Sequence, residues 1–127
     1  MPERVSGIGG VFFRARDPER LREWYAEHLG IELRPFGGAV FFAADGDITV
    51  WHASTADDDY FGPPEQRVML NYRVSDLDAM LGQLRAAGVP TDERVEESGH
   101  GRFGWATDPE GNRLELWQPP TGEYPAD

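Results

Sequence analysis

Residues 9–33 read GGVFFRARDPERLREWYAEHLGIEL and place a short strand directly before a helix. Asp17 and Pro18 suit the N-cap and the first position of that helix, and Gly30 suits its C-terminal cap. The apolar and aromatic side chains between the caps recur at helical spacing and predict one stripe that faces a core or a sheet. These residues are Leu21, Trp24, Tyr25, His28 and Leu29.

The chain repeats this pattern in its second half. The segment MLNYRVSD (69–76) leads into a second helical stretch with an apolar stripe that includes Leu77, Met80 and Leu81. Each half continues into short strands, which close with ITVWHA (48–53) in the first half and LELWQP (114–119) in the second. Because the halves repeat after about 60 residues, they indicate a duplicated module rather than a solenoid. We expect a single domain of 127 residues. Each module is strand, helix and about three strands, at about 5–53 and 67–120, joined by a link at 54–66.

The composition excludes several kinds of chemistry. The chain has no cysteine, and all 12 of its basic residues are arginine. Disulfides, thiolate nucleophiles, cysteine-type zinc sites and Schiff-base lysines are therefore excluded. A formal net charge of −11 argues against a nucleic-acid partner. No apolar run approaches the roughly 20 residues needed to cross a bilayer, so we expect a cytoplasmic protein without a membrane partner.

Residues 9–33, together with DPEGNRLELWQP (108–119), resemble the vicinal oxygen chelate superfamily, which includes glyoxalase I, bleomycin-resistance proteins and extradiol dioxygenases. The resemblance covers roughly residues 5–120. It implies a glyoxalase-like α+β fold in which two βαβββ modules form a curled, cup-shaped mixed sheet. It also implies pairing with a second copy, so we expect a homodimer. The fold hosts many chemistries and does not by itself specify a reaction.

The resemblance also implies four metal-ligand positions, on the first and last strand of each module. In this sequence they are Gly10, Thr49, Met69 and Glu115. Only Glu115 keeps a suitable ligand, because glycine has no donor, threonine is a poor neutral donor and methionine is a soft thioether. We therefore expect no metal cofactor, with a weakly bound divalent ion at Glu115 as the alternative.

Strand alternation from these positions, together with the family's register, predicts an aromatic cup with a few polar groups, as is usual for small-molecule sites. The predicted ligand-binding residues are Phe12, Arg14, Thr49, Trp51, Tyr60, Phe61, Met69, Asn71, Arg73, Phe103, Trp105, Glu115 and Trp117. Tyr60 and Phe61 come from the link and are expected either to form a flap over the cup or to cover the module junction or a dimer contact. The alternation places His52 on the opposite face, and His100 belongs to a glycine-rich loop. The alternative is that the aromatic rings fill a closed barrel interior.

Three roles are open for Glu115 at this stage. It can form a buried ion pair with Arg14 or Arg73, accept a hydrogen bond from a ligand, or act as a catalytic general base. The two arginines favour an oxyanionic ligand, whereas the net charge favours a cationic one. The main hypothesis is a small-molecule-binding protein similar to bleomycin-resistance proteins and without the usual metal site. The alternative is a superfamily enzyme, namely a lyase, isomerase or dioxygenase, that uses Glu115 as base or as residual metal ligand.

Overall fold

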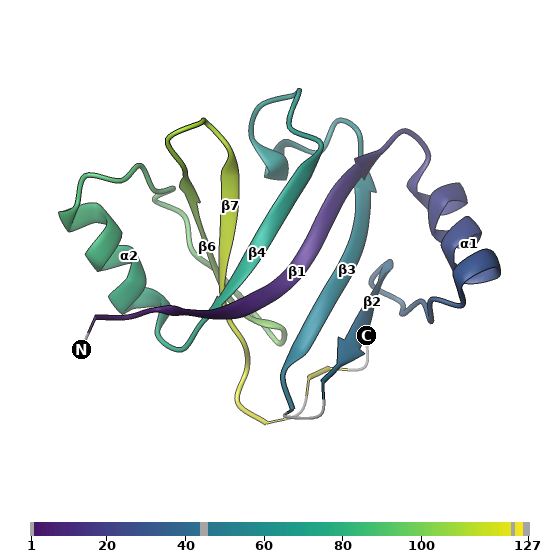
Figure 1. Ribbon diagram of the computed structural model, residues 1–127, viewed down its shortest axis with the longest axis horizontal. Coiled ribbons are helices and arrows are strands. Elements are labelled where there is room, and N and C mark those ends of the chain that lie inside the picture. The colour runs from purple at the N-terminus through teal and green to yellow at the C-terminus, as the bar shows by residue number, and fades with distance from the viewer. Residues whose placement is uncertain (1, 44–45, 123, 126–127) are drawn as a thin grey trace.

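A computed structural model describes residues 2–43, 46–122 and 124–125, and within them the strands form one curled mixed sheet (Figure 1). The strand order is β2-β3-β1-β4-β7-β6-β5. The first module consists of β1 (Val5–Ala15), α1 (Pro18–Leu29), β2 (Gly38–Phe42) and β3 (Ile48–Thr55). The second consists of β4 (Val68–Val74), α2 (Leu77–Ala86), β5 (Glu96–Ser98), β6 (Gly101–Thr107) and β7 (Arg113–Gln118). A short 3₁₀ turn, η1 (Asp59–Phe61), lies in the link between them.

The two modules are joined through the middle of the sheet. In each module the first strand pairs in parallel with the last, β1 with β3 and β4 with β7. The first strands β1 and β4 pair antiparallel with each other and make the sheet continuous. The predicted α+β glyoxalase-like fold is confirmed. The expectation of about three strands after each helix holds in the second module, whereas only β2 and β3 follow α1.

The missing strand of the first module has a local explanation. Residues 31–37 contain Pro35, which has no N–H to donate to a neighbouring strand. They end in a turn in which N of Gly37 donates to O of Arg34 over 2.9 Å. Gly37 has φ +92°, a conformation that favours glycine. The segment therefore turns directly into β2.

The helix α1 begins as the sequence predicts, and the two helices bury different amounts of surface. Oδ1 of Asp17 accepts a hydrogen bond from N of Arg20 over 3.1 Å, and Gly30 closes α1 with φ +69°. In α2 the predicted stripe is buried, at Leu77, Met80 and Leu81. The α1 stripe does not belong to a core, because α1 buries none of its residues, but it faces the sheet, where the ring of Tyr25 packs on that of Trp51. The helix lies at one end of the sheet, and its Trp24 remains 50% exposed (Figure 1).

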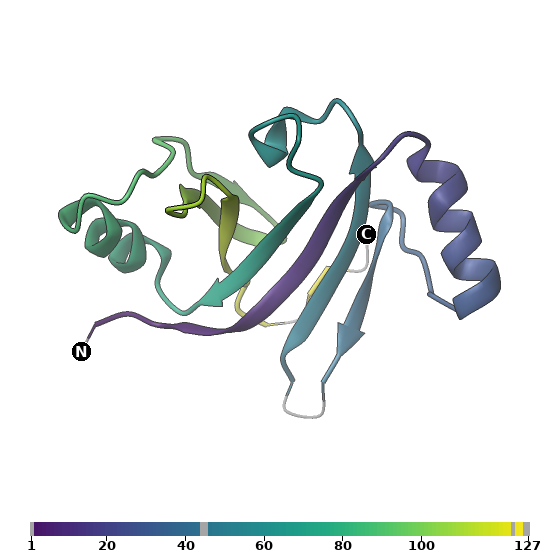
Figure 2. The same cartoon turned by 45° about the horizontal axis from the view of Figure 1, so that its top comes forward.

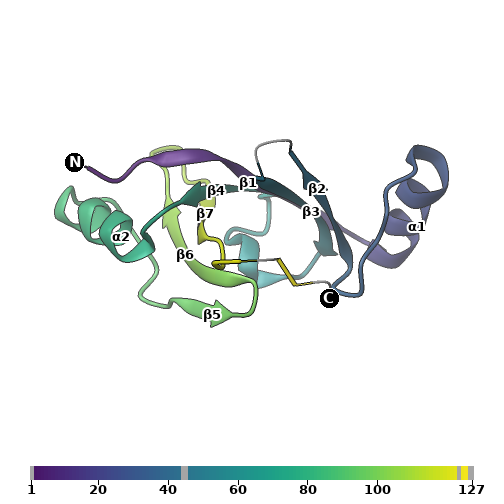
Figure 3. The ribbon, with the colours of Figure 1, turned by 90° about the horizontal axis from the view of Figure 1, so that it is seen from below.

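The sheet separates the core into two regions. On the outer face, α2 packs on β4, β6 and β7 through a buried cluster that includes Val74, Leu81 and Leu116. The concave face carries most of the buried aromatic rings, including Phe61, Trp105 and Trp117. Figure 3 shows the strands curling around this concave side with the helices at opposite ends. In the described part of the chain, neither helix has the length and apolar character needed to cross a membrane.

Candidate functional site

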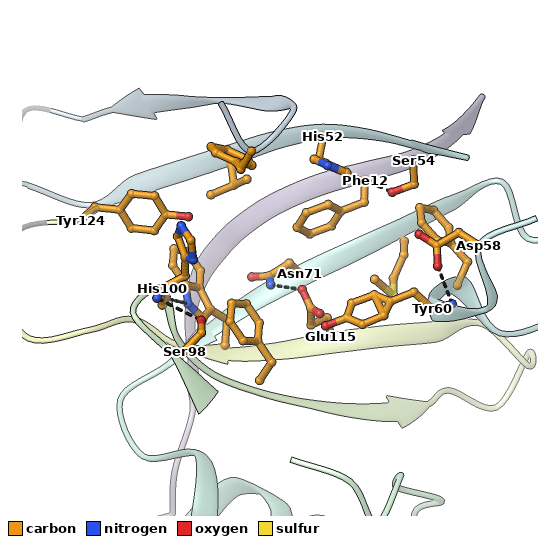
Figure 4. A pocket seen from close by; sticks show the side chains of 16 residues that line it. Phe12, His52, Ser54, Asp58, Tyr60, Asn71, Ser98, His100, Glu115 and Tyr124 are labelled. Carbon is orange, nitrogen blue, oxygen red and sulfur yellow. Dashed lines mark hydrogen bonds between the residues drawn. The ribbon is translucent and has the colours of Figure 1, made fainter. Parts of the chain in front are cut away.

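The concave face encloses a cavity of about 390 Å³ (Figure 4). Eight residues predicted to bind a ligand line this cavity: Phe12, Tyr60, Phe61, Met69, Asn71, Phe103, Glu115 and Trp117. Eight further lining residues were not predicted: Phe36, Val50, His52, Ser54, Asp58, Ser98, His100 and Tyr124. The predicted residues Arg14, Thr49, Trp51, Arg73 and Trp105 lie outside the lining.

Glu115 is placed by strand pairing on both sides of β7. It stands opposite Asn71 in the parallel β4–β7 pair and opposite Trp105 in the antiparallel β6–β7 pair. Nδ2 of Asn71 donates to one carboxyl oxygen over 2.7 Å, and Nε1 of Trp105 donates to the other over 3.0 Å. The side chain is only 1% exposed. The fully buried Trp105 therefore supports Glu115 from behind without lining the cavity itself.

Burial controls the proton affinity of this carboxyl group. Loss of solvent raises the pKa of Glu115 to about 7, although the hydrogen bonds from Asn71 and Trp105 favour the charged form. Tyr60, whose hydroxyl donates to Oε1 of Glu96 over 3.1 Å, has its phenol pKa raised by burial and by the nearby carboxylates. Glu115 therefore titrates close to neutral pH inside an aromatic cavity.

The two arginines expected inside the cup have structural roles elsewhere, which corrects the prediction. Arg14 is buried, and its guanidinium donates to carbonyls of the link, over 2.7 Å to Asp58, 2.9 Å to Pro63 and 2.7 Å to Pro64. These hydrogen bonds tie the loop that carries Tyr60 to the end of β1. Figure 2 shows this loop between the end of β3 and the start of β4.

Arg73 serves the opposite end of the sheet. Its Nη1 donates to the carbonyls of Ile8 and Ile48 over 2.6 Å each, and Nη2 lies 3.4 Å from Oδ2 of Asp47. Since neither Arg14 nor Arg73 pairs with Glu115, the ion-pair interpretation of Glu115 is wrong. Because neither arginine lines the cavity, they do not favour an oxyanionic ligand there.

The predicted orientation of β3 is also wrong. Gly10 pairs with Val50 and Phe12 pairs with His52, so Val50, His52 and Ser54 share the cavity face. Thr49 and Trp51 point to the outer face, where the Trp51 ring packs 5.1 Å from that of Tyr25. The alignment of Trp51 with Trp117 shifted β3 by three residues, because His52 rather than Thr49 occupies the strand position that corresponds to Glu115. A shift by an odd number of residues turns every side chain of a strand to the opposite face.

His52 forms the wall opposite Glu115 in Figure 4. Its ring stacks on Phe36 with a centroid distance of 6.1 Å and an interplanar angle of 8°. Nδ1 lies 3.0 Å from Oγ of Ser54, within hydrogen-bonding distance. Burial, assisted by the charge of Arg22, lowers the imidazole pKa of His52. The imidazole is therefore neutral over most of the pH range in which Glu115 titrates.

The far end of the cavity is formed by a loop and by the C-terminal segment. Nε1 of Trp117 donates to the carbonyl of His100 over 2.8 Å, and the Tyr124 ring packs against both side chains at 5.2 Å and 6.0 Å. Arg34 holds this segment by donating to the carbonyl of Pro125 over 3.2 Å. No periodic pattern marks a tail or loop residue, which explains why sequence reasoning missed these lining residues.

Four strand positions of this chain correspond to the metal-ligand positions of the superfamily. Taking the observed register, they are Gly10, His52, Met69 and Glu115. Among the described residues there is no group of three or more histidine, cysteine, aspartate or glutamate side chains that could hold an ion. Both carboxyl oxygens of Glu115 already accept hydrogen bonds, and the thioether of Met69 is a poor partner for hard divalent ions. This donor set does not fit a chelated metal ion.

The sheet, the duplicated module and the acidic group on β7 define a glyoxalase-like protein. A family model described as "Glyoxalase-like domain" matches residues 10–117, and the chain belongs to this family, within the vicinal oxygen chelate superfamily. Comparison with curated proteins gave no match.

Several solved structures share the fold. Methylmalonyl-CoA epimerase from Mycobacterium tuberculosis is 26% identical, with a TM-score of 0.61, over 91% of this chain and 89% of that one. A variant of the Streptomyces coelicolor methylmalonyl-CoA epimerase, solved with 2-nitronate-propionyl-CoA, is 16% identical, with a TM-score of 0.70, over 96% of this chain and 100% of that one. A Legionella pneumophila protein described as an NAD-dependent benzaldehyde dehydrogenase is 20% identical, with a TM-score of 0.57, over 85% and 96% of the two chains.

Proposed function

We propose that the protein binds a compact small molecule in the cup, anchored on Glu115 and without a chelated metal ion. The observation that carries this proposal is a buried carboxyl group facing a cavity of about 390 Å³ with aromatic walls. Cavities of this size and composition are typical of small-molecule sites. Burying a carboxyl group lowers the stability of the fold, because burial penalises its charged form. A buried carboxyl group in the wall of a cavity therefore indicates a role in function.

The lining favours a ligand that carries a hydrogen-bond donor or a positive charge. Glu115 and Asp58 supply carboxyl groups, whereas no arginine lines the cavity. Rings such as Phe12, Phe103 and Trp117 offer faces that attract a cation and pack on an apolar body. An anionic ligand would meet the ionised form of Glu115 without a compensating cation. The proposed ligand is therefore a neutral or cationic molecule of mainly apolar surface.

Three probes of matched shape test this assignment: 2-phenylethylamine, 2-phenylethanol and 3-phenylpropionate. Their effect on the melting temperature is measured at pH 8, where Glu115 is ionised, for the native chain and for Glu115→Gln. Binding at a hundredfold excess over Kd stabilises the folded state by about 2.7 kcal/mol. We expect stabilisation by the amine first and the alcohol second, and loss of the preference for the amine in Glu115→Gln. Glu110→Gln, at an exposed turn position, is the matched control.

Stabilisation by 3-phenylpropionate alone, or by none of the probes at millimolar concentration, would contradict the ligand class. The metal-free part is tested separately by elemental analysis and by melting in the presence of Mn²⁺, Ni²⁺ and Zn²⁺. A stoichiometric metal ion that is lost in Glu115→Ala would overturn it. A cytoplasmic location and a homodimer stay predictions from the sequence.

A second candidate function is proton transfer, and the titration of Glu115 favours it. A carboxyl group with a pKa of about 7 is partly ionised at neutral pH and can both take and return a proton. In this function the Glu115 carboxylate removes a proton from a carbon next to a carbonyl group, and the enolate that forms is reprotonated at the same carbon. Structures with the same fold include methylmalonyl-CoA epimerases, which are isomerases.

Deuterium exchange at the α-carbon of phenylacetone tests this function. NMR in deuterated buffer follows the exchange with the native chain, Glu115→Gln and Glu110→Gln. A catalytic base at Glu115 predicts exchange above the buffer rate that survives in Glu110→Gln and falls to the buffer rate in Glu115→Gln. Equal rates in all three samples would reject the second candidate and leave the binding function standing.

A further inference from the structure

A second hollow, of about 470 Å³, lies on the outside of the molecule where β1 turns into α1. Figure 1 shows this turn at the upper end of β1. The hollow is lined by Phe13, Arg14, Ala15, Arg16, Asp17, Arg20, Leu21, Trp24 and Arg67. We call it the arginine groove. N of Arg14 donates to the carbonyl of Arg67 over 2.8 Å, which brings the start of β4 beside the end of β1.

The exposed arginines of this groove differ from most other arginines of the chain in the partners of their side chains. Elsewhere Arg73, Arg94, Arg102 and Arg113 form ion pairs with acidic side chains. Arg16, Arg20 and Arg67 are exposed, and within the described residues their side chains have neither an ion pair nor a hydrogen bond. Three guanidinium groups that form no ion pair with a described residue thus line one hollow of a chain whose net charge is −11. Such a cluster is suited to a carboxylate or a phosphate.

The second module shows how the corresponding place is occupied when the chain supplies its own anion. Both helices begin at an aspartate N-cap, Asp17 for α1 and Asp76 for α2. At α2 the carboxylate of Glu3 accepts hydrogen bonds from N of Asp76 and, over 2.8 Å, from Oγ of Ser75. N of Glu3 also donates to Oε1 of Gln83 over 3.0 Å. A carboxylate is therefore a stable occupant at this position of the module.

The first module has no counterpart to that carboxylate. Aligning the two N-caps places Arg16 on Ser75 and Trp24 on Gln83, so that a cation and an indole replace the two neutral partners of Glu3. The residue aligned with Glu3 itself is Gly62, which has no side chain. Among the described residues, the corresponding place in the first module thus carries three arginines and an aromatic ring, and no carboxylate takes the part that Glu3 has at α2.

We propose that the arginine groove binds an external organic anion. Arg16, Arg20 and Arg67 pair with its carboxylate or phosphate group, and a planar apolar part packs on Trp24. Arg20 and Trp24 are one helical turn apart on α1 and face the same side, which lets one ligand reach both. This site is separate from the cup and goes beyond the function proposed for it.

Among the described residues, Asp17 is the one acidic group that lines the groove, and replacing it gives a sharp test. Its carboxylate caps α1 through N of Arg20 and at the same time repels an anion in the groove. Asparagine caps a helix about as well as aspartate does, but it carries no charge. Asp17→Asn is therefore expected to tighten anion binding about two- to fivefold while the helix is retained.

The experiment follows the indole N–H signals of the 4 tryptophans by NMR while phenyl phosphate, inorganic phosphate or phenol is added at low salt. Trp24→Phe assigns the signal of Trp24. We expect a saturable shift of the Trp24 signal with phenyl phosphate, a weaker one with inorganic phosphate and none with phenol. The double variant Arg16→Gln/Arg67→Gln is expected to weaken binding at least tenfold, and Arg4→Gln, an exposed arginine outside the groove, to leave it unchanged.

Three outcomes would overturn the proposal. The Trp24 signal can shift without saturation, the double variant can bind as tightly as the native chain, or Asp17→Asn can weaken binding. A shift of the Trp105 and Trp117 signals in place of Trp24 would assign the probe to the cup and would also reject the groove. The groove is reported by Trp24 and the cup by Trp105 and Trp117. The experiment therefore distinguishes a groove that binds no anion from a cup that binds no ligand.

Discussion

Asn71 and Glu115 form a buried hydrogen bond between two parallel strands, with 2.7 Å between Nδ2 and Oε1 and each side chain 1% exposed. The bond joins the first strand of the second module to its last. Oδ1 of Asn71 is buried and has no hydrogen-bond partner within the described residues. The amide therefore acts here through its donor, which favours the charged form of the carboxyl group.

Replacing Asn71 by leucine is expected to raise the pKa of Glu115 further. A hydrogen bond to a charged group contributes about 1.5–3 kcal/mol, which corresponds to roughly one to two pKa units. Stability should change less, because leucine also removes the unpaired Oδ1. Titration of the Glu115 side-chain carboxyl carbon by NMR measures the shift. Ser98→Ala, elsewhere in the cavity lining, is the control, and an unchanged pKa in Asn71→Leu would contradict the role given to Asn71.

The buried carboxyl group also predicts how stability depends on pH. The folded-state pKa of Glu115 is raised from 4.5 to about 7, so between these values the folded state binds the proton and the unfolded state does not. Its contribution is therefore fully present below about pH 4.5 and is lost as the pH rises through 7. The total is about 3 kcal/mol for a shift of this size.

Comparison of the native chain with Glu115→Gln isolates this effect. His52 acts in the opposite direction, because its lowered pKa makes the folded state lose stability as the pH falls through the imidazole range. The difference in unfolding free energy between native chain and variant cancels that contribution. Urea unfolding at pH 5 and pH 8 should show the variant gaining about 3 kcal/mol relative to the native chain. A pH-independent difference would mean that Glu115 is ionised throughout.

The fold could be predicted from sequence because its signals are local. Asp17, Pro18 and Gly30 mark α1 through backbone rules that hold for any helix. The duplication then implied the same arrangement for β4 and α2, and the structure has it. The burial of α1 could not be predicted in this way, since it depends on where the helix lies against the sheet.

The site was predicted only where strand register was known. β7 and β4 were placed correctly, and Asn71, Glu115 and Trp117 line the cavity as expected. On β3 an alignment that was wrong by three residues exchanged His52 for Thr49 and Trp51. Arg14 was misplaced for a different reason, because alternation gives the face of a strand and not the loop carbonyls that a long side chain can reach.

The guanidinium of Arg14 is predicted to hold one wall of the cavity in place. Arg14→Leu removes the guanidinium donor from the carbonyls of Asp58, Pro63 and Pro64, of which Pro63 keeps the N–H of Gln66. It also removes the cation that lies 5.1 Å from the centre of the Phe61 ring. We expect a loss of about 2–4 kcal/mol in unfolding free energy. The Trp105 indole signal should shift as well, because the Tyr60 ring packs 5.1 Å from Trp105. Arg4→Leu serves as the exposed control, and equal stability of the two variants would contradict the prediction.

The outer face of the central strands is expected to form a homodimer interface. Val68 and Leu70 on β4 and Ile8 on β1 are exposed, and α1 and α2 cover only the two ends of this face (Figure 3). The antiparallel β1–β4 pair lies where the two modules meet, so the same apolar strip can pack on its own copy around a two-fold axis. Burying such a strip against a second copy removes apolar surface from water.

Sedimentation at micromolar concentration measures the association. The native chain should sediment as a dimer and Leu70→Glu as a monomer, since the variant places a charge in the middle of the apolar strip. Leu33→Glu, an exposed leucine in the turn after α1 and away from β4, should remain dimeric. The side chain of Leu70 points away from the cavity, so Leu70→Glu should keep the pKa of Glu115. A native chain that sediments as a monomer, or a Leu70→Glu chain that sediments as a dimer, would show that the strip has another role.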